Sequence, residues 1–117
     1  MATLTDVEKF LTRVRVLIST QQALFLMRPK NKATLEKVEM SVEAALQEIA
    51  GFSPHEYCKG PEADRDRPEQ CCWFFGTDIG GVPVYVKLTI QSLDEDRDRL
   101  VVMSFHEPEW PMRFPFN

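Results

Sequence analysis

Apolar residues recur at helical spacing in the first part of the chain. Residues 5–18 place their apolar side chains on one face, and Thr5 with Glu8 three positions later has the form of a capping box. This pattern predicts a helix with one buried face. Its expected core residues are Val7, Phe10, Leu11, Val14, Leu17 and Ile18. The short apolar run 23–29 stops at Pro29 and is either the last turn of this helix or a short strand, of which we favour an edge strand.

A second amphipathic pattern covers residues 35–49 and predicts another helix, which Gly51 is placed to end. Its apolar positions are Leu35, Val38, Val42, Ala45, Leu46 and Ile49. Residues 51–70 then hold three prolines, two glycines and alternating charges, a composition that predicts an ordered loop without regular structure. A loop of this length in so small a domain is often functional.

The rest of the chain has the two-residue alternation of β-strands. Residues 71–79 and 82–90 are joined through Gly80-Gly81, which is a hairpin signal. A charged turn then leads into residues 100–107. We therefore expect an antiparallel sheet preceded by helices, which is an α+β fold in a single domain, residues 1–117.

The two faces of the predicted strands differ in character. In the strand 82–90 the core face carries Val84, Val86, Leu88 and Ile90, and the opposite face carries Tyr85, Lys87 and Thr89. In the last strand Val101, Met103 and Phe105 alternate with Leu100, Val102, Ser104 and His106. If the polar ends of both strands share a face, they form one patch that the helices leave uncovered, made by Tyr85, Lys87, Ser104 and His106.

Composition and charge restrict the classes of function. No apolar run approaches the roughly 18 residues that span a bilayer, and the first residues carry an acid where a signal peptide needs a basic and then an apolar region. We expect a cytoplasmic protein. The net charge of -4 opposes general binding of polyanions, so any nucleic-acid site must be local.

The three cysteines, Cys58, Cys71 and Cys72, fit neither a disulfide framework nor the spaced pairs of a zinc site. We interpret them as reduced thiols. A metal site made by these cysteines and a histidine is a weaker alternative, because neighbouring residues on a strand point to opposite faces. A Cys58 nucleophile with His106 as its base is compatible with the composition, but no local motif supports it.

His106, at the exit of the last strand, is the strongest candidate for proton transfer. Histidine is the side chain whose ordinary pKa suits acid–base chemistry near neutral pH, although an exposed polar residue at a strand end is an equally good interpretation. The segment "DRDR" occurs twice, at 64–67 and 96–99. The second copy lies in a predicted turn and needs no explanation beyond solubility. The first lies between prolines, where a stiffened loop can hold Arg65 and Arg67 toward a phosphate, or is a solvated charge run.

Two lysines and an aromatic residue complete the candidates. Lys59 starts the long loop and Lys87 projects from the non-core face of its strand, and a lysine beside a reacting phosphate stabilises the charge of the transition state. Trp73 belongs to a strand whose aromatic rings point to both faces, so that one ring is free to stack on a base.

The motifs "EYCKGPEADRDRP", "WFFG", "VYVKLTI" and "VVMSFHEPEWPMRFPF", in this order, resemble the MqsR family of type II toxin–antitoxin systems. The similarity spans residues 5–117 and is most specific from Glu56 to Phe116. It implies a RelE-like fold with N-terminal helices packed on a small antiparallel sheet. It also implies a metal-independent endoribonuclease without a cofactor, which cleaves mRNA by attack of the 2′-hydroxyl on the adjacent phosphate. The implied partners are the RNA substrate and a cognate antitoxin with a helix-turn-helix, and no membrane.

The resemblance assigns roles to individual residues. It implies catalytic roles for Lys59, Tyr85, Lys87 and His106, and contacts to RNA for Arg65, Arg67, Trp73 and Arg113, with no metal ligand. Two positions depart from the family pattern: His106 stands where a catalytic lysine is found, and Phe74 stands where a glutamine follows the tryptophan. The alternative is a catalytically inactive RelE-like module that binds a protein, which the acidic charge and Phe74 favour.

Overall fold

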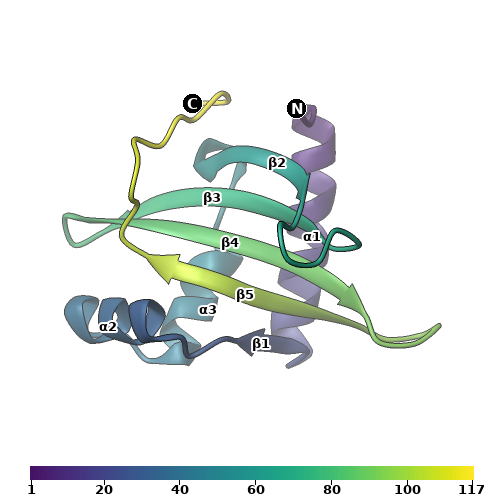
Figure 1. Ribbon diagram of the computed structural model, residues 1–117, viewed down its shortest axis with the longest axis horizontal. Helices are drawn as coiled ribbons and strands as arrows, with labels where there is room; N and C mark the ends of the chain where they lie inside the picture. Colours follow the sequence, from purple (N-terminus) through teal and green to yellow (C-terminus); the bar gives the residue numbers. More distant parts are fainter.

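Five strands form one mixed sheet in the computed structural model, which describes residues 1–117 (Figure 1). Their order across the sheet is β1-β5-β4-β3-β2. The last three strands form the predicted antiparallel meander, and β2 adds a fourth antiparallel strand that was not predicted. Strand β1 pairs with β5 in parallel, so the sheet is mixed and not purely antiparallel. The strands are β1 (Ala23–Phe25), β2 (Tyr57–Ala63), β3 (Cys71–Ile79), β4 (Val82–Ser92) and β5 (Asp98–His106).

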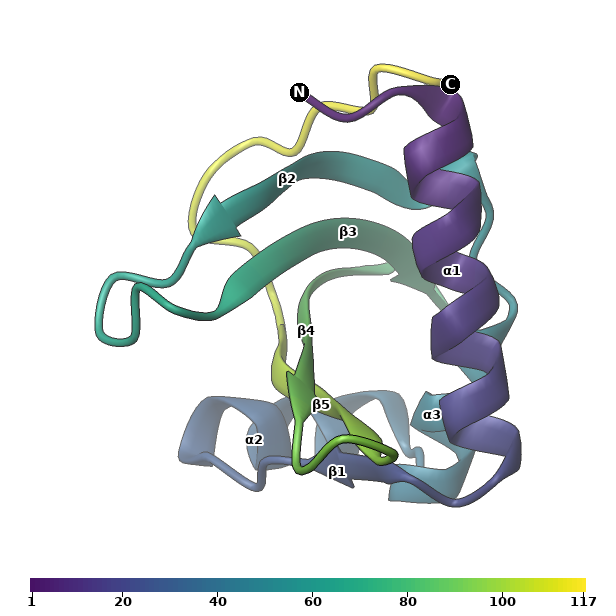
Figure 2. The ribbon, with the colours of Figure 1, turned by 90° about the vertical axis from the view of Figure 1, so that its right-hand side faces the viewer.

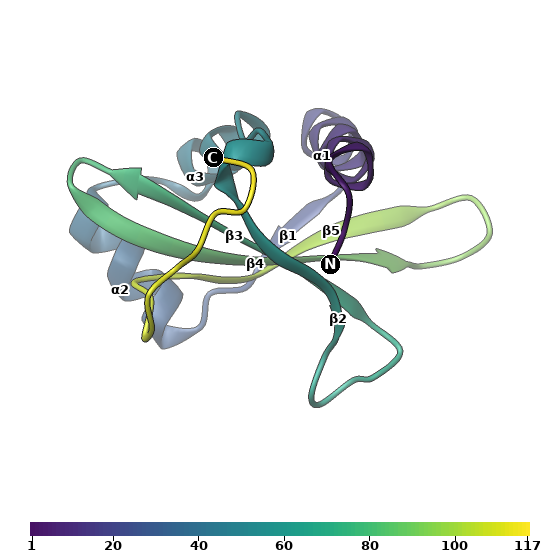
Figure 3. The same ribbon diagram turned by 90° about the horizontal axis from the view of Figure 1, so that it is seen from above.

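Three helices precede the meander, which confirms the predicted α+β class and the edge strand at 23–25. They are α1 (Leu4–Ser19), α2 (Pro29–Val38) and α3 (Val42–Ala50). The first and third cover one face of the curved sheet, and α2 lies beside β5 near the opposite edge from β2 (Figures 2 and 3). None of the three combines the length and the apolar content that a bilayer-spanning helix needs.

Both predicted helices form, but their ends differ from the prediction. The capping box of α1 is made by Thr3 and Asp6, and not by Thr5 and Glu8. The second helix is broken after Val38, because Glu39 adopts a left-handed conformation and the Ser41 hydroxyl accepts from the Ala44 amide to begin a new helix. The apolar spacing continues across this break, which is why periodicity alone predicts one helix.

The prediction of a loop without regular structure at 51–70 is wrong. A short 3-10 turn (Pro54–Glu56) leads directly into β2, which pairs with β3 at the edge of the sheet. The strand carries polar side chains and a proline because only one of its sides is paired, and its register shifts twice along its length. At Gly60, φ is +111° and a Cβ atom would lie 2.7 Å from a backbone oxygen, so only glycine fits there.

A bulge in β5 determines which side chains reach each face. Lys87 pairs with Ser104 and Leu88 pairs with Val102, so Met103 is an extra residue without a partner. Val102 and Phe105 point into the core, whereas Met103, Ser104 and His106 point to the other face. The predicted alternation is therefore wrong after the bulge. It groups Phe105 with Val101 and Met103 of the open side, and it groups Ser104 and His106 with the core residues Leu100 and Val102.

Asn31 of α2 supports the strand at this bulge. Its Nδ2 donates to the carbonyl oxygens of Leu26 (2.8 Å) and Met103 (3.1 Å), and its Oδ1 accepts from the amide of Phe105 (2.9 Å). The side chain is fully buried. Because β1 ends at Phe25, this amide group takes over the hydrogen bonding of the β5 edge for the residues that follow.

The main core lies between the sheet and the helices α1 and α3. All six predicted core positions of α1 are buried, and so are Val84, Val86 and Leu88 of β4, which confirms the predicted core face of both elements. The face opposite α1 and α3, called the open face from here on, carries a second and smaller cluster of buried residues. Its members are Cys72, Phe74, Tyr85, Val101 and Met103.

Candidate active site on the open face

Tyr85 and His106 are direct partners across the strands β4 and β5. Their ring centroids are 5.4 Å apart, and the next pair on the same face is Lys87 with Ser104. The four residues expected to share a patch therefore do share one. This juxtaposition follows from the antiparallel register and from the bulge, which returns His106 to the face of Tyr85.

A hollow of about 300 Å³ opens beside Tyr85 on this face. We call it the aromatic hollow, and its lining includes Lys59, Phe74, Tyr85, Trp110, Met112 and Arg113. The Tyr85 ring contacts Phe74 (6.0 Å between centroids) and the edge of Trp110 (5.3 Å). One wall is the chain after β5, which crosses the ends of the strands toward α3 (Figure 3). Rings at these distances, with cationic groups around them, can hold a base and its phosphate together.

The tautomer of His106 follows from one hydrogen bond. Its Nδ1 lies 2.9 Å from the carbonyl oxygen of Glu107, and a carbonyl oxygen only accepts. Nδ1 therefore carries the hydrogen, and in the neutral ring Nε2 has a free lone pair. Nε2 forms no hydrogen bond within the chain, so it is available as a proton acceptor.

Tyr85 is suited to donate rather than to accept a proton. Its residue is only 6% exposed, and burial raises the pKa of Tyr85 well above its ordinary value. The hydroxyl keeps its proton at neutral pH and forms no hydrogen bond within the chain. It is therefore a donor that is free to bind a ligand in the aromatic hollow.

Lys59 and Arg113 bring positive charge to the aromatic hollow. Lys59 projects from β2, with its Nζ 4.6 Å from the centre of the Phe74 ring. It also pairs with Glu62 at 3.4 Å, a contact between two half-exposed side chains. An exposed pair of this kind is weak and exchanges readily for another anion.

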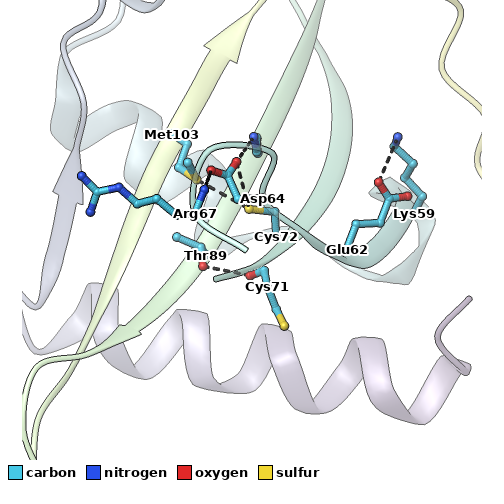
Figure 4. Close-up of polar contacts among 9 residues, drawn as sticks. Lys59, Glu62, Asp64, Arg67, Cys71, Cys72, Thr89 and Met103 are labelled. Atoms are coloured by element: carbon cyan, nitrogen blue, oxygen red, sulfur yellow. Dashed lines mark hydrogen bonds and ion pairs between the residues drawn. The ribbon is translucent and has the colours of Figure 1, made fainter. Parts of the chain in front are cut away.

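Lys87 is held differently, in an ion pair with Asp64 of the β2–β3 connection (Figure 4). Lys87 Nζ donates to Asp64 Oδ1 at 2.8 Å, while the Arg67 amide donates to Oδ2 at 3.1 Å. The Asp64 side chain is 7% exposed, and the hydrogen bond from Lys87 is the main cause of its lowered pKa. The positive charge of Lys87 is therefore compensated by Asp64 when no ligand is bound.

The other predicted RNA contacts lie elsewhere. Trp73 faces the opposite side of the sheet, where its ring stacks on Phe10 at 4.3 Å and lines a separate hollow of about 610 Å³. Arg65 is exposed in the β2–β3 connection, and no ion pair joins it to the aromatic hollow. Arg67 lies in the same connection but borders a second hollow on the open face. The structure thus brings Lys59, Tyr85 and Arg113 together around the aromatic hollow. His106 contacts Tyr85 but does not line the hollow, and Lys87 adjoins Tyr85 on the same strand face.

Sequence reasoning missed two residues of this site. Trp110 follows β5 and is 48% exposed although it packs against Tyr85, and no periodic signal marks it. Asp64 is the first residue of the first "DRDR" copy, and its burial distinguishes it from the exposed acids around it. The two prolines that enclose this copy were the available signal.

The cysteines do not form a ligand set. Cys71 is exposed and Cys72 is buried on the open face, as expected for strand neighbours. Cys58 lines the aromatic hollow, where burial raises the pKa of its thiol to about 11. A thiol that keeps its proton is a poor nucleophile at neutral pH. No cluster of His, Cys, Asp and Glu side chains has the arrangement of metal ligands.

The chain matches no protein-family model, and neither a curated protein nor a solved structure matches it. The resemblance to the MqsR family therefore rests on the motifs quoted above.

Proposed function

We propose that the protein is the toxin of a type II toxin–antitoxin system, an endoribonuclease that cleaves mRNA in the cytoplasm without a metal ion. The observation that carries this proposal is the pairing of Tyr85 with His106 beside a hollow that also holds Lys59. All three are residues to which the motif resemblance assigns catalysis.

The proposed reaction forms a bond between the RNA 2′-oxygen and the adjacent phosphorus and breaks the bond from phosphorus to the 5′-oxygen. Nε2 of His106 takes the proton of the 2′-hydroxyl, since Nδ1 is already bonded to a carbonyl. The Tyr85 hydroxyl gives its proton to the leaving 5′-oxygen, and the resulting tyrosinate regains a proton, through solvent, from the protonated His106. Lys59 and Arg113 stabilise the charge that gathers on the phosphate. The products are a 2′,3′-cyclic phosphate and a 5′-hydroxyl.

The proposal is tested by incubating the purified protein with RNA of mixed sequence, with and without a chelator. Cleavage in both conditions, with 2′,3′-cyclic phosphate ends, is the expected result. His106→Ala should stop it. The matched control is His55→Ala, because the only other histidine of the chain is exposed in the 3-10 turn and lines a different hollow. Cleavage that the chelator abolishes, or that survives His106→Ala, contradicts the proposed chemistry.

A non-catalytic module that binds a protein is the second candidate. The observation in its favour is that Lys59 and Lys87 both have carboxylate partners within the chain, so neither presents an unpaired charge to RNA. The same incubation separates the two candidates, because the module leaves RNA intact in both conditions. Binding of a cognate antitoxin with a helix-turn-helix, by contrast, is part of the toxin proposal, and its co-expression should relieve growth arrest.

A further inference from the structure

A second hollow, of about 480 Å³, lies on the open face between the β1–α2 connection and the β2–β3 connection. We call it the arginine hollow because Arg28, Arg67 and Arg99 line it together with Lys87. The three arginines come from segments far apart in the sequence. Arg67 and Arg99 end the two "DRDR" copies, so the second copy, expected to serve solubility only, also contributes a residue here.

None of the three guanidinium groups forms an ion pair, although the chain has 18 acidic and 14 basic residues. Two acids line the hollow. Asp64 is buried and its oxygens are already engaged by Lys87 and by the Arg67 amide, whereas Asp66 is exposed and forms no ion pair with any of the three arginines. Three unneutralised arginines around one hollow in an acidic protein favour binding of an anion.

The guanidinium group of Arg99 lacks one of its hydrogen-bond acceptors within the chain. Its Nη2 donates to Gln91 Oε1 at 2.8 Å, whereas its Nε is buried and has no hydrogen-bond partner. A buried N–H without an acceptor is costly, so the Arg99 side chain gains hydrogen bonds if it shifts to present its guanidinium fork to an anionic oxygen in the hollow.

We propose that the arginine hollow binds phosphates of the RNA backbone one to three nucleotides away from the one that is cleaved, an inference that rests on the proposed function. Lys87 joins the two hollows, since it lines the arginine hollow and its Nζ lies 5.8 Å from the Phe74 ring of the aromatic hollow. Successive outward residues of a strand are about 6.6 Å apart, so an RNA strand that follows β4 from Tyr85 reaches Lys87 after one such step. Arg99 pairs with Gln91, three outward steps or about 20 Å from Tyr85, which is about three nucleotides of an extended strand.

Phosphate, rather than a base, is the group that this hollow fits. No aromatic ring lines it, so it offers no surface for stacking, in contrast to the aromatic hollow. Its donors are guanidinium forks, which bind phosphate oxygens in pairs. The two hollows thus divide the recognition of one nucleotide strand between a ring-lined position and a backbone position.

The test measures binding of 2′-O-methyl oligonucleotides, which lack the attacking hydroxyl and are not cleaved. Wild-type protein should bind a pentanucleotide more tightly than a dinucleotide. Arg99→Gln and the exposed Arg28→Gln should each lower pentanucleotide affinity about fivefold to tenfold and reduce its salt dependence, with dinucleotide affinity unchanged. Arg97→Gln is the matched control, because this arginine of the same "DRDR" copy is exposed and pairs with Asp94.

Two results overturn the proposal. The first is pentanucleotide affinity that neither variant lowers beyond the control. The second is an equal loss of affinity for the dinucleotide and the pentanucleotide. This result would mean that the arginines bind the cleaved phosphate or attract RNA only through their overall charge. Failure of the proposed function is distinct: RNA then stays intact, while length-dependent loss in the Arg28 and Arg99 variants still supports a backbone-binding hollow.

Discussion

Replacing Tyr85 with phenylalanine removes one oxygen atom and no hydrogen bond, because the hydroxyl has no partner within the chain. The other tyrosine, Tyr57, is the opposite case. It is fully buried, its hydroxyl donates to the carbonyl of Gly60, and it accepts from the amide of Ala2 at 3.4 Å. The same substitution at the two tyrosines therefore separates catalysis from stability.

The expected magnitudes differ in kind. Tyr85→Phe keeps the ring contacts with Phe74 and Trp110, so the free energy of unfolding should change by less than about 0.5 kcal/mol. Loss of a proton donor should slow cleavage about a hundred- to ten-thousandfold, which corresponds to about 2.7 to 5.5 kcal/mol of transition-state stabilisation. Tyr57→Phe leaves a buried carbonyl without its donor and should cost about 1 to 3 kcal/mol of folding free energy.

The assay combines single-turnover cleavage of a labelled RNA with thermal unfolding of each variant. Tyr57→Phe should lower the melting temperature by at least about 4 °C and keep most of the cleavage rate. Tyr85→Phe should keep the wild-type melting temperature and lose most of the cleavage rate. Retention of more than about a tenth of the wild-type rate in Tyr85→Phe is below the range of acid–base catalysis and refutes the role of this hydroxyl.

Three further predictions concern the surroundings of the site. Asp64→Asn keeps a carbonyl oxygen but removes the negative charge of the Lys87 ion pair and should lower stability at pH 7 by about 1.5 kcal/mol. Because the pKa of Asp64 is lowered in the folded protein, this contribution is complete above the unfolded carboxyl pKa of about 3.9 and is lost as the pH falls through the folded value. Melting curves of wild type and variant should therefore converge in acid, and a constant difference down to strongly acidic pH contradicts this. Gly76→Ala puts a Cβ atom into contact with the Met112 sulfur and should displace the chain after β5. The displacement should change the tryptophan fluorescence and weaken oligonucleotide binding. If the substitution changes neither, the contact between Gly76 and Met112 is refuted. Cys58→Ser should leave the cleavage rate unchanged, since burial raises the thiol pKa to about 11, and a large loss of rate would revive a cysteine nucleophile.

The elements that sequence predicts well are those whose apolar spacing is unbroken. The buried face of α1 and the two faces of β4 follow from periodicity alone, and the hairpin follows from the Gly80-Gly81 turn signal between two alternating segments. The pairing of Tyr85 with His106 could be stated only as a condition, because a strict two-residue period groups His106 with Leu100 and Val102, which lie in the core. The bulge at Met103, which no periodic signal marks, returns His106 to the face of Tyr85.

The failures occur where local geometry interrupts a period. The turn at Glu39 divides a helix whose apolar spacing continues, and β2 lacks the alternating apolar side chains by which strands are found. The Lys87–Asp64 pair was out of reach, because Asp64 lies 23 positions away and its burial depends on how the β2–β3 connection folds back over β4. The role of Trp110 likewise depends on the course of the chain after β5.

The extra residue Met103 links the chemistry of the site to the formation of the core. Without the bulge, continued pairing of β5 with β4 would place Phe105 opposite Tyr85 and turn His106 toward the helices. That arrangement exposes a phenylalanine, whose burial stabilises the fold by about 1.5 to 3 kcal/mol, and it also removes the Asn31 bond to the Phe105 amide. The strand end therefore has two competing registers, and burial of the Phe105 side chain selects the one in which His106 lies opposite Tyr85. Substitutions that remove the Phe105 ring or the Asn31 hydrogen bond should allow a one-residue slip that separates His106 from Tyr85 while most of the sheet remains folded.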